Sequence, residues 1–288
     1  MKFQRVYIEI TNICGLACSF CPPKPNPNKT MSLSFFETIL HQLKPYTKTL
    51  AFHLFGDPFT LSNLSSYLSL AGENGFSVEL TTSGFYLQHH KPQEIFASSL
   101  RQLNISLNSF NKNSSSLTFE SYMKQIFSYC EAKSKRSFIN LRLWNLDELS
   151  SEAEFNAKIY THLESFFSTT IDRDAKSFRL SSKTLLVHDS YFEWPSLSSS
   201  HHSHGFCYAP SSHFGILASG KVVPCCLDGE GVIALGDLNT TPLVDILECK
   251  RASTLREGFA KGICTEELCQ KCSYKDRFSY NCKCENLK

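Results

Sequence analysis

The chain has 288 residues, 42% of them hydrophobic, and its 29 basic and 27 acidic residues leave a net charge of +2. This length allows one large domain or two smaller ones, and the near-neutral charge lacks the basic excess that is typical of nucleic-acid-binding proteins. A nucleic-acid partner is therefore not indicated, though not excluded. No apolar run reaches the length of about 18 residues that indicates a membrane-spanning helix, so we expect no membrane span.

Residues 6–10 alternate apolar and polar side chains, which predicts a strand and not the apolar core of a signal peptide. We therefore expect a cytoplasmic protein. The chain holds 13 cysteines, and in a reducing cytosol clustered cysteines are more often metal ligands or catalysts than disulfide partners. The cysteines are accordingly the first candidates for a functional site.

Short apolar segments alternate with helix-like segments over the first two-thirds of the chain. The predicted strands are residues 6–10, 49–54, 76–81, 102–107, 139–144 and 178–180. The predicted helices are residues 34–43, 61–75, 92–99, 119–134 and 146–167, and Ser34 with Glu37 predicts a capping box at the first of them. This alternation indicates βαβ units in a parallel sheet. Because these units are too few for an eight-unit barrel, we predict an α/β fold with a partial, open barrel.

A polar stretch rich in serine and histidine, residues 195–205, interrupts this pattern and is typical of a linker or loop. We expect its histidines, His201, His202 and His204, to belong to a solvated linker rather than to a metal site. Nine of the 13 cysteines follow this stretch, from Cys207 onward. The change in composition predicts two domains, residues 1–188 and a cysteine-rich second domain of residues 189–288.

Three of the remaining cysteines, Cys14, Cys18 and Cys21, lie directly after the first predicted strand in the pattern C-x3-C-x2-C. Three thiolates on so short a loop can hold three corners of a [4Fe–4S] cluster, which leaves one iron open to a small molecule. A zinc site normally needs a fourth ligand, and none lies within this loop. Short cysteine clusters also bind zinc, so the spacing alone leaves both metals open.

With the aromatic Phe20 before its third cysteine, this loop resembles that of the radical S-adenosylmethionine (SAM) superfamily. The resemblance implies a partial (β/α)6 barrel, SAM bound to the open iron through its amino and carboxylate groups, and an electron donor such as flavodoxin or ferredoxin. It also implies one-electron cleavage of SAM to a 5′-deoxyadenosyl radical that abstracts a hydrogen atom from a substrate. The cofactor carries this chemistry, while the protein positions the reactants and excludes water.

Two further segments resemble parts of the family that contact SAM. Gly56 and Asp57 lie in a Phe-Gly-Asp-Pro turn after the second predicted strand, similar to a Gly-Gly-Glu-Pro turn that receives the SAM amino group. Ser106 and Asn108 lie in Ile-Ser-Leu-Asn, which resembles a stretch whose polar side chains reach the SAM ribose. An ordinary turn at Asp57 and plain strand-end roles for Ser106 and Asn108 remain the alternatives.

Two residues at the fifth predicted strand complete the implied SAM site. Arg142 is implied to pair with the SAM carboxylate, for which a planar guanidinium is well suited, and Asn145 is implied to contact the nucleoside. A solvent-facing position on an alternating strand remains the alternative for Arg142.

The C-terminal cysteines form a second set. Residues 220–225 are predicted as a hairpin strand that delivers Cys225, and Cys269 with Cys272 forms a CxxC knuckle, which can hold a metal from a tight turn. With Cys207, this arrangement resembles the SPASM/Twitch extension of many radical SAM enzymes. The resemblance implies that Cys207, Cys225, Cys269 and Cys272 hold an auxiliary [4Fe–4S] cluster.

The extension departs from the full SPASM pattern, because nine residues separate Cys272 from Cys282 and the longer terminal cysteine series is not reproduced. We therefore expect one auxiliary cluster. A second cluster at Cys264, Cys282 and Cys284 with some fourth ligand stays open, and so does a zinc knuckle that only stabilises the domain.

Two residues beside the proposed ligands are candidates for catalysis. Cys226 is next to Cys225, in a neighbourhood that faces the substrate in related enzymes, and is either a hydrogen donor, a substrate-bonding thiol or a small buried residue. Asp228 is a candidate general base for an oxidation. Cys130 and Cys249 lie in helix-like segments and are expected in the core.

The sequence thus predicts an enzyme that uses SAM, a three-cysteine [4Fe–4S] cluster and an auxiliary cluster to oxidise or modify an unknown small-molecule or peptide substrate. The chain begins at the first barrel strand, which weakens the expectation of a built-in leader-peptide domain. The alternatives are an iron–sulfur electron carrier and a zinc-binding interaction protein, neither of which uses SAM chemistry.

Overall fold

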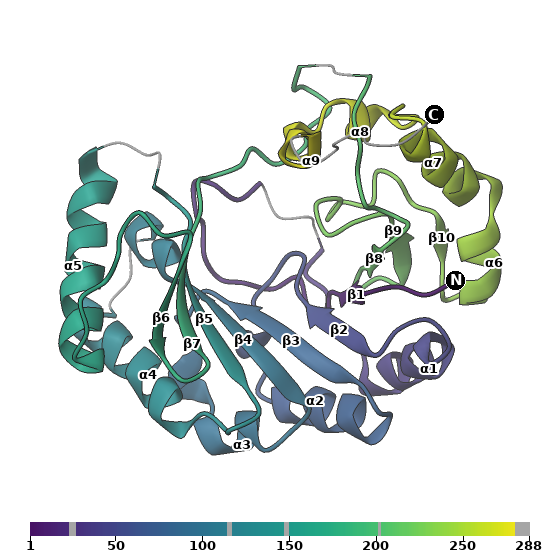
Figure 1. Ribbon diagram of the computed structural model, residues 1–288. Coiled ribbons are helices and arrows are strands. Elements are labelled where there is room, and N and C mark those ends of the chain that lie inside the picture. The colour runs from purple at the N-terminus through teal and green to yellow at the C-terminus, as the bar shows by residue number, and fades with distance from the viewer. Residues whose placement is uncertain (23–26, 114–116, 147–149, 201–202, 280–288) are drawn as a thin grey trace, which may run out of the picture.

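The computed structural model describes residues 1–22, 27–113, 117–146, 150–200 and 203–279. Over these residues the strands form one sheet in the order β10-β9-β8-β1-β2-β3-β4-β5-β7-β6. Its parallel strands, in spatial order, are β8 (His213–Ile216), β1 (Arg5–Ile8), β2 (Thr49–Phe52), β3 (Ser77–Thr82), β4 (Leu100–Ser106), β5 (Phe138–Leu143) and β7 (Thr184–His188). The sheet curves into an open barrel (Figure 1), which confirms the predicted fold class.

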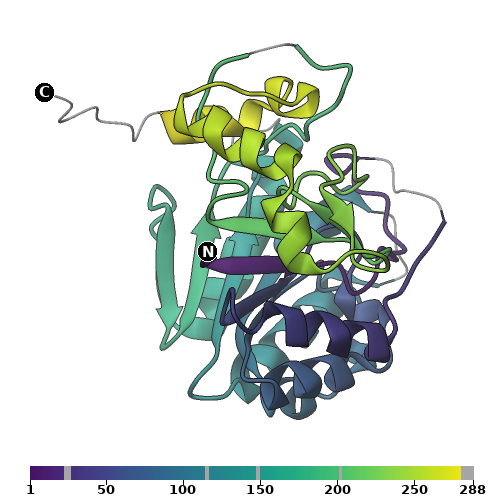
Figure 2. The same cartoon turned by 90° about the vertical axis from the view of Figure 1, so that its right-hand side faces the viewer.

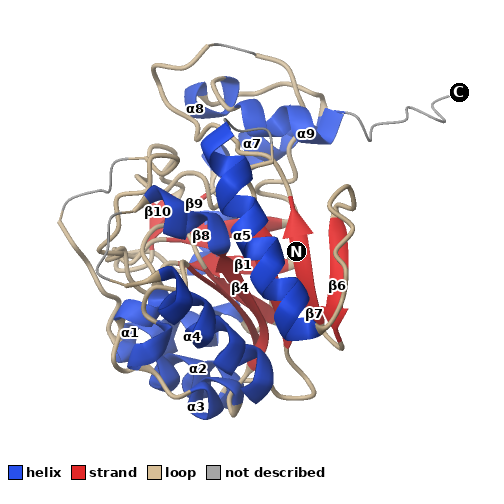
Figure 3. Ribbon diagram, turned by 90° about the vertical axis from the view of Figure 1, so that its left-hand side faces the viewer, coloured by secondary structure: helices blue, strands red, loops and turns tan. Residues whose placement is uncertain are grey.

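Helices cover the outer face of this sheet (Figures 1 and 3). They are α1 (Leu33–Leu43), α2 (Leu64–Glu73), α3 (Pro92–Phe96), α4 (Phe119–Ala132) and α5 (Ser150–Phe167). The buried side chains of α1 are Phe36, Ile39, Leu40 and Leu43, which recur at the helical spacing that gives one apolar face. The outward side chains of β1, Val6 and Ile8, are fully buried, so the core lies between strands and helices.

The start of α1 differs from the predicted capping box. Ser32, and not Ser34, is the N-cap, because its hydroxyl accepts a hydrogen bond from the Phe35 amide at 3.2 Å. Ser34 already lies in the first turn, where its carbonyl accepts from the Thr38 hydroxyl. The backbone of Ser32 is extended, as an N-cap requires, whereas a residue inside the helix cannot cap it.

The sixth parallel strand is not the predicted one. The segment predicted as residues 178–180 forms β6 (Ser177–Ser181), which pairs antiparallel with β7 at the edge of the sheet. The strand beside β5 is instead β7, which the sequence analysis missed. A tight turn joins the two strands, with Lys183 at a φ of 62°, in the left-handed region that few non-glycine residues adopt.

The C-terminal part of the chain extends the same sheet. β8 pairs parallel with β1, β9 (Lys221–Val223) pairs antiparallel with β8, and β10 (Gly236–Asp237) pairs antiparallel with β9. The predicted hairpin strand is therefore confirmed as β9, while β8 was not predicted. The helices that follow are α6 (Leu243–Glu248), α7 (Lys250–Ala260), α8 (Glu267–Gln270) and α9 (Asp276–Ser279).

The last three of these helices lie at the end of the molecule toward which β7 points (Figures 2 and 3). A side-chain bond fixes this arrangement, since Arg277 of α9 donates to Asp189, the residue after β7, at 3.0 Å. One hydrophobic core runs from Phe3 to Leu268. The C-terminal part thus covers the rim formed by the carboxyl ends of the barrel strands, and the domain boundary at residue 188 stays a prediction.

Candidate functional site

The loop that carries the first three cysteines follows β1 at this rim, where open α/β folds place their ligands. The Tyr86 hydroxyl donates to the Cys14 carbonyl at 2.6 Å. Gly15 has a φ of +69°, and a Cβ there would lie 2.3 Å from the Tyr86 oxygen. Glycine at this position therefore permits both the turn and the close approach of Tyr86 that holds the loop.

A second residue binds the loop from the other side. Asn113, at the end of the 3₁₀ helix Leu107–Lys112, donates from Nδ2 to the Cys18 Sγ at 2.9 Å and to the Ser109 carbonyl at 2.8 Å. Its Oδ1 accepts from the Ala17 amide at 2.8 Å. The connection after β4 thereby fixes both the backbone and one sulfur of the cysteine loop.

Phe20, the aromatic residue of the loop, faces the segment that follows β7. Its ring centroid lies 5.2 Å from that of Tyr191. Phe20, Cys21, Tyr191 and Lys112 help to line a cavity of about 510 Å³. This cavity places open space directly beside the third cysteine.

The Phe-Gly-Asp-Pro turn packs against the backbone at the start of the cysteine loop. Gly56 has a φ of +74°, and a Cβ there would lie 2.2 Å from the Thr11 carbonyl oxygen. The Asp57 amide donates to the Ile13 carbonyl at 2.8 Å. Glycine is therefore required at position 56, since any side chain would separate the turn from the cysteine loop.

The Asp57 carboxylate is buried and holds this turn to the end of β3. Its Oδ1 accepts from the Phe59 amide at 3.1 Å, and its Oδ2 accepts from the Thr82 hydroxyl and from the amide and hydroxyl of Ser83 at 2.6–3.0 Å. Burial raises the pKa of Asp57, and these hydrogen bonds lower it. These contacts suit the ordinary-turn alternative, while the contact with the SAM amino group stays a prediction.

The other predicted SAM residues lie on β4, β5 and the segments after them. Ser106 ends β4 and pairs with Arg142 of β5, and Asn108 is buried in the following 3₁₀ helix. Arg142 lies on the inner face of the barrel, because it alternates along β5 with Leu141 and Leu143, which are fully buried on the helix-covered face. Burial lowers the pKa of Arg142 to about 10. This position disfavours the solvent-facing alternative for Arg142.

Asn145 is 1% exposed and has an unused acceptor. Its Nδ2 donates to Glu152 Oε2 at 2.6 Å and to Asn156 Oδ1 at 2.9 Å. Its Oδ1 has no hydrogen-bond partner among the described residues. A buried acceptor without a donor is costly, and the contact of Asn145 with the nucleoside stays a prediction.

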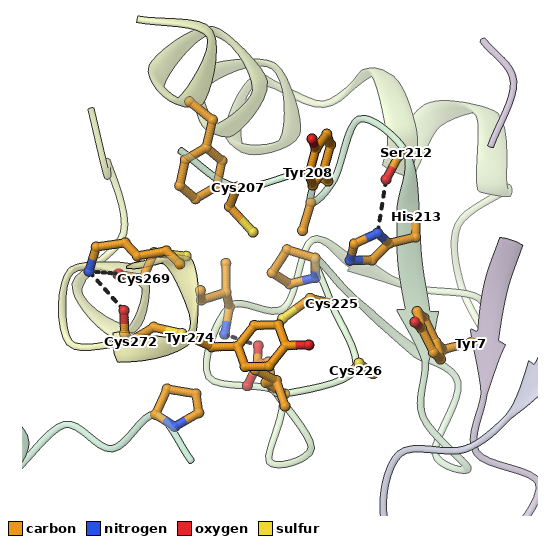
Figure 4. A pocket seen from close by; sticks show the side chains of 18 of the residues that line it. Tyr7, Cys207, Tyr208, Ser212, His213, Cys225, Cys226, Cys269, Cys272 and Tyr274 are labelled. Carbon is orange, nitrogen blue, oxygen red and sulfur yellow. Dashed lines mark hydrogen bonds between the residues drawn. The ribbon is translucent and has the colours of Figure 1, made fainter. Parts of the chain in front are cut away.

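The second cysteine set converges on one cavity. Cys207, Cys225, Cys269 and Cys272 line a space of about 390 Å³ between the β8–β9 hairpin and α8 (Figure 4). Burial raises the pKa of each of these thiols, to about 11 for Cys207, and charge on neighbouring cysteines raises the pKa of Cys207, Cys225 and Cys269 further. Buried thiols with raised pKa values lose their protons only when a cation between them stabilises the thiolates, so this donor set fits an iron–sulfur cluster.

In the described part of the chain, no three His, Cys, Asp or Glu side chains are gathered around a single metal ion. A [4Fe–4S] cube does not require this, because each thiolate binds a different iron. Of the other candidates for a second cluster, Cys264 is buried, and Cys282 and Cys284 lie outside the described residues. His201 and His202 of the predicted linker lie outside them as well.

Cys226 faces away from these four cysteines, toward β1 (Figure 4). The side chain of Tyr7 packs against the same small apolar cluster as Cys226, and burial raises the pKa of the Cys226 thiol to about 11. Cys226 also packs against the apolar side chains of Leu54, Leu217 and Val223. It therefore lies between the auxiliary cavity and the barrel, and its chemical role stays a prediction.

Asp228 lines the same cavity, but its carboxylate is used by the loop that follows it. The amides of Val232 and Ile233 each donate to it at 2.8 Å. Burial raises the pKa of Asp228, and these bonds lower it. This pattern is that of a loop-stabilising carboxylate, and general-base catalysis by Asp228 stays a prediction.

Comparison with known proteins bears on these two sites. The model of the radical SAM superfamily matches residues 8–158, more than half of the chain. The chain belongs to the radical SAM superfamily. A second model, SPASM, described as an iron–sulfur cluster-binding domain, matches residues 207–273. Cys14, Cys18 and Cys21 fall within the first match, and the four cysteines of the auxiliary cavity fall within the second.

Solved structures of radical SAM proteins share this fold. The complex of BtrN with AdoMet and 2-DOIA has a TM-score of 0.60 at 15% identity, covering 95% of this chain and 94% of BtrN. AdoMet-bound anSMEcpe has a TM-score of 0.58 at 13% identity, covering 98% and 97% of the two chains. Streptococcus suis SuiB bound to S-adenosylmethionine has a TM-score of 0.51 at 14% identity, covering 96% of this chain and 74% of SuiB. No curated protein sequence matches the chain.

As a radical SAM enzyme, the protein uses SAM and a [4Fe–4S] cluster, and its SPASM domain implies auxiliary iron–sulfur clusters. No helix among the described residues is long and apolar enough to cross a membrane. Cys130 is buried, as expected of a core residue. Cys249 is only partly buried and caps α7, where its sulfur accepts from the Ala252 amide.

Several residues at these radical SAM sites were not predicted. Of these residues, only Glu9 is marked in the sequence, as an acidic residue within the apolar predicted strand of residues 6–10. Its carboxylate accepts from the Phe55 amide at 3.2 Å and from the Ala218 amide at 3.1 Å. Burial raises the pKa of Glu9 to about 7. No motif surrounds Tyr7, Asn113 or the buried Lys275, which follows the CxxC knuckle. Tertiary contacts alone bring these three residues to the cysteines.

Proposed function

We propose that this radical SAM enzyme oxidises a small polar substrate that is held inside the barrel, between the three-cysteine loop and the auxiliary cavity. The observation that carries this proposal is that two residues of β1 border both the auxiliary cavity and the barrel interior. Arg5 and Tyr7 of β1 line the auxiliary cavity together with its four cysteines, and the same two residues face the barrel interior. A substrate in the barrel therefore lies next to the auxiliary site.

The inner face of the barrel is polar, which supports a polar substrate. Arg5 forms an ion pair with Glu79 of β3 at 2.6 Å, and Arg142 projects from β5 with its guanidinium 4.6 Å from the ring centroid of Trp144. Burial and the charge of Arg142 lower the pKa of His53 to about 4, so this imidazole is neutral. Neutral and charged hydrogen-bonding groups of this kind orient a polar molecule in an enclosed site.

The rim is covered in a way that favours a small substrate over a long peptide. Trp194 stacks on Phe55 with ring centroids 5.4 Å apart, and Phe192 packs edge-on against Tyr274 at 5.1 Å. The segment after β7 thus joins the β2 turn to the C-terminal part across the rim. Solved neighbours include both the BtrN complex with 2-DOIA and an anSMEcpe complex with a peptide, so the fold by itself does not decide.

The proposed roles follow from these positions. Cys14, Cys18 and Cys21 hold the cluster that binds SAM. SAM, when bound there, supplies the 5′-deoxyadenosyl radical that takes a hydrogen atom from the substrate. The resulting substrate radical completes a two-electron oxidation by losing one proton and one electron. We propose the auxiliary cluster as the acceptor of that electron, with Cys226 and Asp228 as candidates for handling the proton.

The remaining proposed contacts are with SAM itself. Arg142 pairs with its carboxylate, as a guanidinium suits a carboxylate, and the unused Asn145 Oδ1 accepts from the nucleoside. Ser106 and Asn108 serve the ribose side. Asp57 and Gly56 shape the turn at the amino group of SAM.

The test is anaerobic reconstitution with iron and sulfide, followed by dithionite and SAM, with 5′-deoxyadenosine measured by mass spectrometry. We expect 5′-deoxyadenosine from the wild type and none from Cys18→Ala. Equal product from both proteins contradicts the assignment of the cysteine loop. No product from the fully loaded wild type favours an electron carrier instead, and a protein that does not take up iron favours a zinc-binding protein.

A further inference from the structure

Lys275 follows the CxxC knuckle and is one of the largest fully buried side chains of the protein, with 2% of its surface exposed. Its ammonium donates to three backbone carbonyls, those of Cys269 at 3.2 Å, Gln270 at 3.1 Å and Cys272 at 2.8 Å. Two of these carbonyls belong to proposed cluster ligands. The lysine thus binds the knuckle from within the protein.

No carboxylate among the described residues lies within ion-pair distance of this ammonium, although the same part of the chain forms several ion pairs elsewhere. Lysine is almost never fully buried unless it is paired, because an ammonium removed from water needs a compensating charge. Three carbonyl dipoles orient the ammonium but leave its charge uncompensated. Among the described residues, no carboxylate therefore pairs with this ammonium, although the charge of Asp276 acts on the same thiols of Cys264 and Cys272.

The cavity of the four cysteines can hold an anion beside Lys275. Lys275 lines the cavity of about 390 Å³ that the four cysteines also line, and its charge acts on the thiols of Cys272 and Cys264. The aliphatic stem lies against Gly205, where a Cβ would come within 2.7 Å of the Lys275 Cδ. The backbone at Gly205 thus encloses the stem, while Lys275 itself lines the cavity of the four thiols.

We propose that Lys275 is the counter-cation of the auxiliary cluster and sets its reduction potential. A cube held by four thiolates is anionic, and it becomes more so when it accepts an electron. A fixed cation beside it stabilises the reduced form more than the oxidised form, and cluster potentials depend on net charge and nearby hydrogen bonds. Lys275 therefore makes the auxiliary cluster a better electron acceptor, without itself touching the substrate.

A purely structural role is the competing explanation. Lysine near the end of a helix often binds the last carbonyls, and α8 ends beside these acceptors. Such a cap is equally effective with its stem at the surface and gives no reason for burial without a carboxylate. The two explanations differ in one quantity, because only the counter-cation changes the potential of the cluster.

This inference rests on the proposed ligand set, so the experiment first isolates the auxiliary cluster. The full chain carrying Cys14→Ala, Cys18→Ala and Cys21→Ala is reconstituted, and its remaining cluster is verified by iron count and by electron paramagnetic resonance. Addition of Cys269→Ala is expected to remove that cluster. If it does not, the ligand set of the proposed function is wrong, independently of Lys275.

In the same background, Lys275→Met, Lys275→Gln and Lys275→Arg are compared by redox titration followed by electron paramagnetic resonance. We expect Met and Gln to shift the midpoint potential to more negative values, and Arg to restore it. The control is Lys271→Met. This lysine belongs to the same knuckle, but its ammonium pairs with Glu267 at 3.0 Å, and the potential should change much less.

Every outcome decides between the two explanations. A loaded Lys275→Met protein with the wild-type potential overturns the proposal, and so does a shift no larger than that of Lys271→Met. If Met and Gln lose the cluster while Arg retains it at the wild-type potential, the positive charge is what the cluster requires, and the proposal stands. If Arg loses it as well, Lys275 is a packing element and the proposal fails.

Discussion

The side-chain amide of Asn113 donates a hydrogen bond to the Cys18 sulfur at 2.9 Å while its oxygen accepts from the Ala17 amide at 2.8 Å. One planar group therefore holds a proposed cluster ligand and the backbone next to it in a fixed relation. Hydrogen bonds to cluster sulfurs tune reduction potentials. We therefore expect Asn113 to position the SAM-binding cluster, although no motif marks it.

Replacing Asn113 tests this relation. We expect Asn113→Asp, which keeps the acceptor but loses the N–H donor and adds a negative charge, to shift the midpoint potential of the N-terminal cluster to more negative values. Formation of 5′-deoxyadenosine should slow by about tenfold or more, since a hydrogen bond to a charged group contributes roughly 1.5–3 kcal/mol. The matched control is Asn111→Asp, because Asn111 bonds to Glu152 and not to the loop. Equal shifts in both variants would remove the special role of Asn113.

The number of clusters is open to direct counting. Two [4Fe–4S] clusters give about eight irons per chain, and we expect Cys269→Ala to lower this to about four while 5′-deoxyadenosine still forms, because SAM binds at the other site. Cys249→Ala is the control, since Cys249 caps α7 and lies outside the auxiliary cavity. About eight irons in Cys269→Ala, or about four in Cys249→Ala, contradicts the assigned ligands.

Replacing Gly56 by alanine is expected to lower both the stability of the protein and its iron content. Gly56→Ala adds a Cβ 2.2 Å from the Thr11 carbonyl oxygen at a positive φ, so the turn must move away from the cysteine loop. We expect the free energy of unfolding to fall by more than about 2 kcal/mol and iron to be lost from the N-terminal site. Gly75→Ala is matched in φ but has nothing within 4 Å of the added Cβ, so it should cost only about 1–2 kcal/mol and keep its iron. Urea unfolding and iron counts measure both effects.

Glu9 predicts a pH dependence of stability. Burial raises its pKa from 4.5 to about 7 in the folded protein, so the folded state binds its proton more tightly than the unfolded state does. The stabilisation of the folded state by the proton on Glu9 is fully present below about pH 4.5 and is lost as the pH rises through about 7. A shift of this size corresponds to about 3 kcal/mol.

Glu9→Gln isolates this contribution, because glutamine keeps one oxygen acceptor and does not ionise. We expect the stability of the wild type relative to Glu9→Gln to fall by up to about 3 kcal/mol between about pH 5 and pH 8, measured by anaerobic urea titration. A difference that stays constant over this range, or that rises with pH, would show that Glu9 ionises freely in the folded protein.

The sequence predicted the barrel strands and the cysteine sites because both leave local patterns. Apolar periodicity marks β1 to β5, and cysteine spacing marks the loop and the knuckle. It missed β8 because this strand pairs with β1 across some two hundred residues, and nothing local indicates such a partner. It placed the sixth parallel strand in residues 178–180 because these residues are as apolar as β7, and only the sheet pairing separates the two.

The two acidic residues predicted at the sites show a second limit of prediction from sequence. Asp57 and Asp228 were singled out by their place in a motif or beside a ligand, but their oxygens accept backbone and hydroxyl hydrogen bonds. A carboxylate that closes a turn and one that binds a ligand have the same local sequence. Lys275 shows the reverse case, because its burial arises from the fold around it and cannot be anticipated from a lysine in a polar stretch.

The pairing of β8 with β1 also has a consequence for the movement of electrons. Residues 5–8 of β1 pair with residues 213–216 of β8. The three-cysteine loop follows β1, while Cys207 precedes β8 and Cys225 follows β9. The distance from Cys207 and Cys225 to the strand that leads into the three-cysteine loop, which an electron passing between the two sites must cross, therefore depends on a β-ladder.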